Sequence, residues 1–306
     1  MAFPAFFPSA VRQLQDPAAI ALARSAQRAA VPTPLHPQPL PTAFARWGEG
    51  SGSEPPLLLL HGFDSSLLEF YRLMPELAPL GERWALDLVG FGFTARWPQL
   101  PYGPAALKAH LHAFWQARIG QPVVAVGVSM GGAAALDWAL SYPHAVRAVV
   151  ALDSVGYSGN FAIGPWLLPP LDGLAVAFWR QRKLQAQFWA ERTGVLDPAA
   201  LEVLRCFSLP LAMPGWHEAL RRFTRSGGYT HLAPHIPQLS QPALIVWGEQ
   251  DRTLGDAERF HRAIARAQLA RIPGAGHAPH LDRPQAVARA IQAFARSLAA
   301  ASSTSP

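Results

Sequence analysis

The chain has 306 residues, of which 50% are hydrophobic and 15% are charged, and its formal net charge is +6 at pH 7. This length and apolar content allow a large buried core, but no apolar run approaches the ~20 residues that a membrane-spanning helix needs. The single cysteine, Cys206, excludes an internal disulfide and a cysteine-rich metal site, and we expect it to be a small buried residue.

The excess of basic residues bears on the partners of the protein. The arginines are scattered, and no run of five or more basic residues occurs. We therefore expect no nucleic-acid partner. Two interpretations of the charge stay open: a basic surface without a dedicated partner, and peripheral attraction to an anionic membrane.

Residues 1–38 are expected to form an N-terminal extension. The segment lacks the basic start and unbroken apolar core of a secretory signal. Residues 17–30 place Ala, Ile and Leu on one face, which predicts a short helix that docks on the protein's own body. A membrane-surface anchor and an organelle transit peptide are the alternatives, since the segment is poor in acids and contains Arg and Ser.

Beyond the extension, short apolar runs alternate with helical stretches, which is typical of a parallel sheet buried on both faces. We assign residues 39–156 and 229–298 to one α/β core and residues 299–306 to a tail. Helices are expected around 67–80, 104–119 and 131–143. Strands are expected at 42–47, 57–60, 84–89, 123–128, 146–153, 243–247 and 267–273.

The alternation stops between residues 157 and 228, where the sequence predicts short helices rich in Trp, Phe and Leu. An insertion of this size between two strands is more often a lid over a site than a separate domain. Its tryptophans are therefore candidates to line a substrate site: Trp166, Trp179, Trp189 and Trp216.

The segment Gly127-Val128-Ser129-Met130-Gly131 fits the pattern G-x-S-x-G at a strand-to-helix turn. Such a turn presents the Ser129 hydroxyl above the sheet edge, and its glycines let neighbouring backbones approach closely. The N–H groups at the start of the next helix can stabilise an oxyanion, and Met130 supplies the first of them. The pattern predicts a nucleophilic serine, with an ordinary turn serine as the alternative.

Three further features stand where such a serine needs them. His61-Gly62-Phe63 follows the strand at 57–60, and the backbone N–H of Phe63 is the expected second oxyanion donor. Asp251 follows the strand at 243–247, and His277 lies in a glycine-flanked loop after the next strand. His277 is expected to accept the serine proton, and Asp251 to hold the imidazole in the correct tautomer.

Other residues compete for these roles. Asp153 also ends a strand and is an alternative acid, Glu249 is a weaker one, and His280 is an alternative base. His61 is expected to tie down the oxyanion loop and is also a candidate to line the substrate site.

Two more acids are interpreted as structural. Asp64 is expected to cap the following helix, and Asp87 to stabilise loops. No His, Cys and Asp cluster has metal-ligand spacing and no glycine-rich phosphate loop occurs, so neither a metal nor another cofactor is expected.

Together, the segments LLLLHGFDSSLLEF, WALDLVGFGFT, GVSMGGAAALD, FTRSGGY, ALIVWGEQD and GHAPHLDRP resemble the α/β-hydrolase superfamily over residues 40–295. More narrowly, they resemble the chlorophyll dephytylases of plastids and their cyanobacterial relatives. The resemblance implies an α/β-hydrolase fold that cleaves the phytyl ester of chlorophyll to chlorophyllide and phytol. Because that substrate lies in a membrane, we expect the protein in the cytoplasm or at the periphery of the thylakoid membrane.

Rival functions remain on the same scaffold. A small-molecule esterase, a lipase-like enzyme or a C–C bond hydrolase would share these residues and differ in the lid. A ligand-binding receptor that keeps them but turns over slowly is a rival of another class. Haloalkane dehalogenases and epoxide hydrolases carry an aspartate as the nucleophile at this turn. The serine at position 129 therefore disfavours their chemistry.

Overall fold

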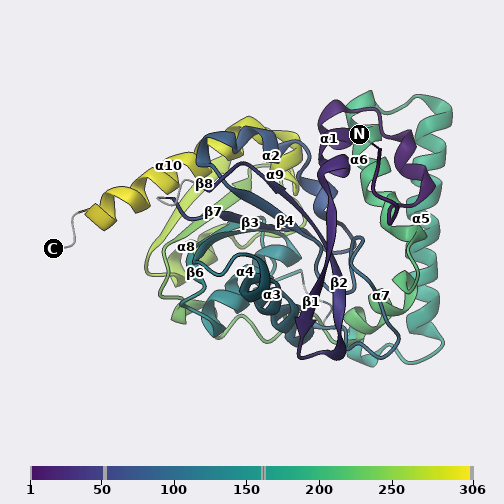
Figure 1. Cartoon of the computed structure of the whole chain (residues 1–306), viewed down its shortest axis with the longest axis horizontal. Helices are drawn as coiled ribbons and strands as arrows, with labels where there is room; N and C mark the ends of the chain where they lie inside the picture. The colour runs from purple at the N-terminus through teal and green to yellow at the C-terminus, as the bar shows by residue number, and fades with distance from the viewer. Residues whose placement is uncertain (1, 51–53, 160, 162, 304–306) are drawn as a thin grey trace.

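The structure, a computed structural model, describes residues 2–50, 54–159, 161 and 163–303. Within these residues, eight strands form one sheet in the order β1-β2-β4-β3-β5-β6-β7-β8 (Figure 1). The pairs β1–β2 and β2–β4 are antiparallel, and all other neighbours are parallel. The mostly parallel α/β sheet predicted from the sequence is confirmed. The strands are β1 (Gln27–Thr33), β2 (His36–Trp47), β3 (Leu57–Leu60), β4 (Arg83–Leu86), β5 (Val123–Val128), β6 (Val146–Leu152), β7 (Ala243–Gly248) and β8 (Ala267–Ile272).

Helices cover both faces of this sheet. One hydrophobic core contains side chains of α3 (Pro104–Arg118), α4 (Met130–Ser141) and α8 (Ala257–Ala263). The opposite core contains side chains of α1, α2, α9 and α10. The helices of this second face are α1 (Pro17–Ser25), α2 (Leu73–Glu76), α9 (Pro279–Asp282) and α10 (Pro284–Ser303).

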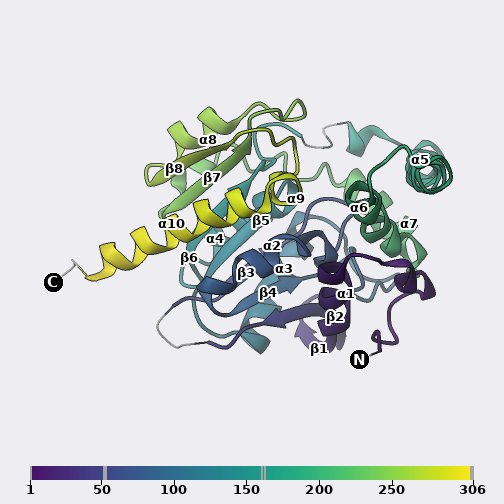
Figure 2. The ribbon, with the colours of Figure 1, turned by 90° about the horizontal axis from the view of Figure 1, so that it is seen from above.

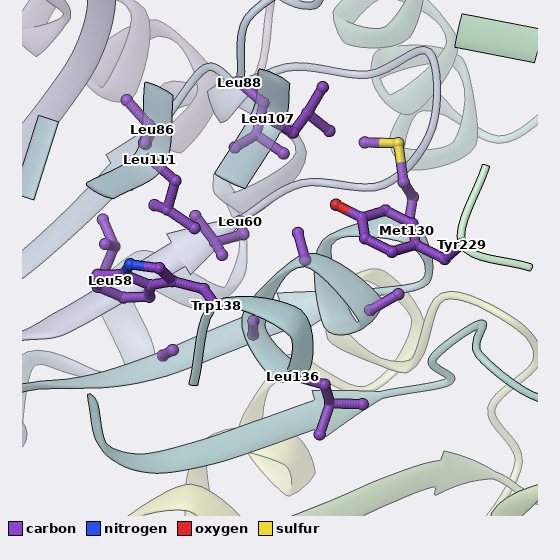
Figure 3. Close-up of a cluster of buried hydrophobic side chains, with 14 of the residues drawn as sticks. Leu58, Leu60, Leu86, Leu88, Leu107, Leu111, Met130, Leu136, Trp138 and Tyr229 are labelled. Atoms are coloured by element: carbon purple, nitrogen blue, oxygen red, sulfur yellow. The ribbon is translucent and has the colours of Figure 1, made fainter. Parts of the chain in front are cut away.

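Strand β3 shows why a run of four leucines is stable here. Leu58 and Leu60 belong to the first core, and Leu57 and Leu59 to the second. Successive side chains of a strand point to opposite faces, so an unbroken apolar run is what a doubly covered strand requires. Figure 3 shows Leu58 and Leu60 packed with leucines of α3 and with Trp138 of α4.

The N-terminal region departs from the expected boundary at residue 38. A helix does form at α1, but β1 follows at once and pairs with β2, so this part of the predicted extension belongs to the sheet. β1 lies at the sheet edge, and Val31 is its one fully buried residue. Its partner β2 carries three prolines, all in the part that pairs with β1 and not with β4, where one side of the strand is free of ladder hydrogen bonds. An exposed, proline-rich edge pair lacks the apolar pattern that reveals inner strands.

The helix expected at 67–80 is also wrong as a single element. The chain there forms two 3-10 turns around the four-residue α2. Pro75 and Pro79 each remove a backbone N–H donor, which prevents a continuous helix. At the other end of the chain, α10 runs into the predicted tail as far as Ser303, and residues 304–306 lie outside the described residues.

The insertion between β6 and β7 contains α5 (Leu171–Thr193), α6 (Pro198–Ser208) and α7 (Trp216–Arg225). The expectation of short helices is wrong for α5, which has 23 residues. Figures 1 and 2 show α5 at the margin of the molecule on the side away from the C-terminus, with α6 and α7 between it and the sheet. We call residues 157–228 the helical insertion.

The N-terminal segment contacts this insertion. The backbone N–H groups of Gln15 and Asp16 donate to Oε1 of Glu202 on α6, at 2.8 and 2.9 Å. Glu202 is buried, so the contact joins the start of the chain to the insertion.

None of the helices that the structure describes combines the length and the apolar character that a membrane span requires.

Candidate active site

Ser129 lies between β5 and α4, with a positive φ of 51°. The turn is closed by backbone contacts. A Cβ on Gly127 would lie 2.1 Å from the carbonyl oxygen of Gly131, and a Cβ on Gly131 would lie 2.0 Å from that of Leu60. The sequence can make this turn only with glycine at both positions, and the packing fixes where the hydroxyl stands.

Ser129 begins a hydrogen-bonded chain of three side chains. His277 Nε2 lies 3.2 Å from Ser129 Oγ, and His277 Nδ1 lies 3.1 Å from Asp251 Oδ2. Asp251 is held in turn by the Thr253 N–H, which donates to Oδ1 at 2.7 Å. The structure thus brings together the three residues that the sequence nominated, although they come from three separate loops.

The Asp251 carboxyl is stabilised as an anion. Burial acts to raise its pKa, but hydrogen bonds from His277 and the Thr253 N–H outweigh burial, and the net pKa lies below the ordinary value. An ionised Asp251 accepts the His277 Nδ1–H, which leaves Nε2 free to accept the serine proton.

Asp153, the alternative acid, supports Asp251 instead of replacing it. It follows β6 at a positive φ of 39°, is fully buried, and accepts the Gly248 N–H at 3.1 Å. Burial, together with the neighbouring Asp251, raises the pKa of Asp153 to about 9. Asp153 is therefore protonated at neutral pH and donates to Asp251, which helps to lower the pKa of Asp251.

The other two competitors lie elsewhere. Glu249 is exposed. His280 is buried, and its Nε2 lies 3.3 Å from Glu69 Oε1. The ligand atoms of Asp153, Asp251 and His277 lie within 4.8 Å of one another, but their hydrogen bonds to each other and to backbone N–H groups already account for that closeness.

The loop after β3 is held from the core side. The Leu88 N–H donates to His61 Nε2 at 3.2 Å, so Nδ1 carries the proton and donates to the carbonyl of Gly62 at 2.7 Å. Burial lowers the pKa of His61, which keeps the ring neutral. The peptide unit that contains the Gly62 carbonyl also contains the Phe63 N–H, so this contact orients the expected oxyanion donor. The other expected donor is the N–H of Met130, which has no partner within α4 because Met130 is the first residue of that helix.

Asp64 does not cap a helix, and that expectation was wrong. Ser66 is the N-cap of the following 3-10 turn. The Asp64 carboxylate instead accepts hydrogen bonds from Trp216 Nε1 at 2.7 Å, Trp179 Nε1 at 2.7 Å and Lys183 Nζ at 2.8 Å. These donors are 115 residues or more away in the chain, and no local sequence signal announces such a contact.

An apolar cavity of about 240 Å³ lies between α5 and α7. Its lining includes Phe63, Phe161, Val176, Trp179 and Leu220. Phe63 and Phe161 also line a space of about 40 Å³ at Ser129 and Met130. The cavity and the serine are therefore separated by aromatic side chains common to both.

The expected substrate-lining residues fall into different places. Trp179 lines the cavity, whereas Trp216 and His61 are buried. Trp166 and Trp189 are 82% and 59% exposed on the outside of the insertion, so the expectation does not hold for them. Aromatic content alone does not distinguish the inner face of a lid from its outer face. Phe161 and Leu220, which do line the cavity, were not nominated from the sequence.

Comparison with known proteins agrees with this fold. Residues 55–284 match the family described as alpha/beta hydrolase fold, and the chain belongs to that family. It is a hydrolase. It is 30% identical to the alpha/beta hydrolase domain-containing protein VTE7 of Arabidopsis thaliana, over 96% of this chain and 90% of that protein.

Two further similarities are informative. A 2-hydroxy-6-oxo-2,4-heptadienoate hydrolase of Pseudomonas putida is 29% identical, over 79% of this chain and 90% of the relative. A thermophilic esterase from Thermogutta terrifontis, whose structure was solved with malate bound, superposes with a TM-score of 0.67. It is 23% identical, and the match covers 89% of this chain and 99% of the esterase.

Proposed function

We propose that the protein is a serine carboxylic-ester hydrolase that uses Ser129, His277 and Asp251. The observation that carries the proposal is the hydrogen-bonded chain from Asp251 through His277 to Ser129 Oγ. His277 Nε2 takes the serine proton while Oγ attacks the ester carbonyl carbon. The Phe63 and Met130 N–H groups stabilise the oxyanion that forms.

The two halves of the reaction use the same groups. Protonated His277 gives its proton to the alcohol oxygen, the C–O bond breaks, and the acid portion remains on Ser129 as an ester. His277 then takes a proton from water, whose oxygen attacks the acyl carbon, and Ser129 leaves with the proton returned. Asp251 stays ionised throughout and stabilises the imidazolium.

The substrate class that we propose is a large apolar ester, and the favoured substrate is the phytyl ester of a chlorophyll-type pigment. The cavity between α5 and α7 is almost entirely apolar, which suits an isoprenoid chain. Its volume of about 240 Å³ suits a chain and not a macrocycle, so the macrocycle would lie outside it. The resemblance of the motifs to dephytylases points the same way.

A second candidate is a hydrolase of small esters or of C–C bonds. The 40 Å³ space at Ser129 favours it, because only a small acyl group fits there without movement of Phe63 or Phe161. The similarity to a 2-hydroxy-6-oxo-2,4-heptadienoate hydrolase also supports it.

The test is a paired assay of the wild type and Ser129→Ala. Each protein receives detergent-solubilised chlorophyll a and, separately, a short nitrophenyl ester, and the pigments are separated by chromatography. Chlorophyllide formed by the wild type and not by the variant supports the dephytylase. Cleavage of the short ester alone supports the second candidate, and activity that survives in Ser129→Ala refutes the serine mechanism.

We also propose that the outer face of α5 contacts an anionic membrane surface, which for this pigment is the thylakoid. Every large hydrophobic side chain recorded as exposed in the described residues lies between positions 163 and 196. Helical spacing aligns several of them with cations along one stripe of α5: Leu171, Leu174, Phe178, Arg182, Trp189 and Arg192.

Positive side chains on this face favour an anionic bilayer over a partner that is only apolar. Arg182 lies over the Phe178 ring and Arg192 over the Phe188 ring, each at 5.9 Å, so the cations stand among the aromatic rings. Sedimentation with vesicles checks this. We expect binding to vesicles that contain phosphatidylglycerol, weakened by salt and by Phe178→Ser with Trp189→Ser. Dimerisation without vesicle binding would replace the bilayer with a second copy of the chain.

A further inference from the structure

Asp64 stands immediately after Phe63 and is a buried junction between the core and the helical insertion. Its side chain is 3% exposed, and its φ of 52° lies in the left-handed region that few residues other than glycine adopt. An Asp tolerates this conformation better than most side chains, but its buried carboxylate needs strong partners.

All the side-chain donors recorded for this carboxylate come from the insertion. Trp216 of α7 donates to Oδ1, and Trp179 and Lys183 of α5 donate to Oδ2. Lys183 Nζ also donates to the backbone carbonyl of Asp64 at 3.1 Å. If α5 and α7 moved away, this carboxylate would lose three donors at once and would have to take water in their place, which removes the contacts that hold the Asp64 backbone at its positive φ.

The peptide between Gly62 and Phe63 is therefore clamped from two sides. On the core side, His61 Nδ1 donates to the Gly62 carbonyl, and the Gly62 N–H donates to Glu69 Oε2 at 2.7 Å. On the insertion side, the next residue is Asp64 with its donors. The direction of the Phe63 N–H depends on both clamps.

We propose that Asp64 is a positioning residue that couples docking of the helical insertion to the oxyanion site. When Trp179, Lys183 and Trp216 engage its carboxylate, the Phe63 N–H points to the space beside Ser129. When they release it, the loop relaxes and this donor is lost. The inference rests on the proposed oxyanion role of Phe63 and adds that the insertion controls this role from a distance.

The coupling has a consequence that a substrate-binding role of the same tryptophans does not have. The space at Ser129 is lined by Phe223 of α7 but not by Trp179, Lys183 or Trp216. Hydrolysis of an ester small enough to stay within that space should still depend on Trp216 and Lys183. Loss of one oxyanion donor typically costs about 10²–10³-fold in kcat, and a misplaced donor costs part of that. We expect kcat to fall about tenfold or more, with KM for the small ester unchanged.

The experiment measures kcat and KM for nitrophenyl acetate and nitrophenyl decanoate. The variants are Asp64→Asn, Trp216→Phe and Lys183→Met. The matched control is Trp115→Phe, which removes an indole donor bonded to the Gln121 carbonyl at 2.7 Å on the far helix α3. We expect the three variants to lose kcat equally on both esters, and the control to keep wild-type kcat.

Two readouts separate positioning from general loosening. The apparent pKa of kcat/KM should stay at the wild-type value, because the His277–Asp251 pair is untouched. The double variant Asp64→Asn with Trp216→Phe should lose no more kcat than the worse single variant, since both break one unit. Losses confined to KM for the decanoate, or losses that multiply in the double variant, would overturn the proposal.

The design also separates this inference from the proposed function. If Ser129→Ala is inactive and the Asp64-linked variants keep full kcat, only the coupling fails. If Ser129→Ala remains active, the serine mechanism itself fails. Circular dichroism and the melting temperature verify folding, and if Asp64→Asn does not fold, Trp216→Phe and Lys183→Met carry the test.

Discussion

The two sides of the active site are held by different kinds of contact. On the sheet side, Ser129 stands in a turn where backbone packs directly against backbone, with no space for one extra carbon at Gly131. On the insertion side, apolar side chains of α6 and α7 pack into the two cores, and buried carboxylates add a few hydrogen bonds: Asp64 from the loop after β3, and Glu202 from α6. The backbone packing at Ser129 is rigid, whereas these hydrogen bonds can be broken and remade.

This difference has a functional meaning. A nucleophile must be pre-organised, and close packing achieves that. A lid, which is the role that the sequence predicts for the insertion, must release substrate and product, and a small set of polar contacts can be broken together. Helix α5 lies at the margin of the molecule (Figure 2), and the side chains of Leu171, Leu174, Phe178 and Trp189 along it are exposed.

The sharpest test of the rigid side is Gly131→Ala. The new Cβ would meet the carbonyl oxygens of Leu60 and His61 at 2.0 and 2.6 Å, and backbone cannot turn aside as a side chain can. We expect the free energy of unfolding to fall by about 3 kcal/mol or more, with loss of activity. Gly255→Ala, where nothing lies within 4 Å, is the matched control in chemical denaturation. Equal stability of the two variants would contradict the close packing described for the turn.

On the insertion side, Glu202→Ala is expected to be less damaging. It leaves the N–H groups of Gln15 and Asp16 without their acceptor, which should lower the free energy of unfolding by about 2 kcal/mol. It should also expose the N-terminal segment to limited proteolysis. Glu202→Gln keeps an acceptor oxygen and should lose less. If both variants are cleaved as slowly as the wild type, the contact does not secure the segment.

Sequence patterns revealed the rigid side well and the insertion side poorly. The inner strands and the G-x-S-x-G turn are encoded by neighbouring residues, because a doubly buried strand must be apolar and a tight turn needs glycine. Strand β1 was missed, since an edge strand with one fully buried residue has no such pattern.

The polar contacts of the insertion are not indicated by any pattern of neighbouring residues in the sequence. Asp64 meets Trp216 across 152 positions, and each residue alone has an ordinary explanation. The same limit applies to Asp153. Its position at a strand end made it a rival acid, and only the fold shows that it lies buried beside Asp251, where burial raises its pKa. For the two tryptophans of α5, the direction depends on how the helix is rotated: Trp179 and Lys183 reach Asp64, whereas Trp189 is exposed.

Asp153 gives a pH test of the sheet side. Because its pKa is about 9 when folded and ordinary, near 4, when unfolded, the folded protein holds one extra proton between these values. The contribution of this proton to stability is complete below about pH 4 and is lost as the pH rises to about 9. The loss amounts to up to about 1.4 kcal/mol per pH unit.

Asp153→Asn removes this titration and can still donate a hydrogen bond to Asp251. We therefore expect the variant to lose less stability than the wild type between pH 6 and pH 7, by up to about 1.4 kcal/mol, as measured by urea denaturation. Parallel curves for the two proteins over this interval would show that Asp153 is ionised in the folded state.

The smallest expected effect belongs to the outer face of α5. Trp189 is 59% exposed, and Ser and Trp have similar helix propensities, so Trp189→Ser should change the free energy of unfolding by less than about 0.5 kcal/mol. The same change should weaken binding to anionic vesicles, because an exposed indole contributes to a surface that is not yet covered. Trp216→Phe, buried and bonded to Asp64, should do the reverse and lower stability without affecting vesicle binding. If Trp189→Ser destabilises the protein as much as Trp216→Phe does, the outer stripe of α5 is packed against protein in solution. The contrast between an inner side that is bonded to Asp64 and an outer side that is free to bind a membrane would then not hold.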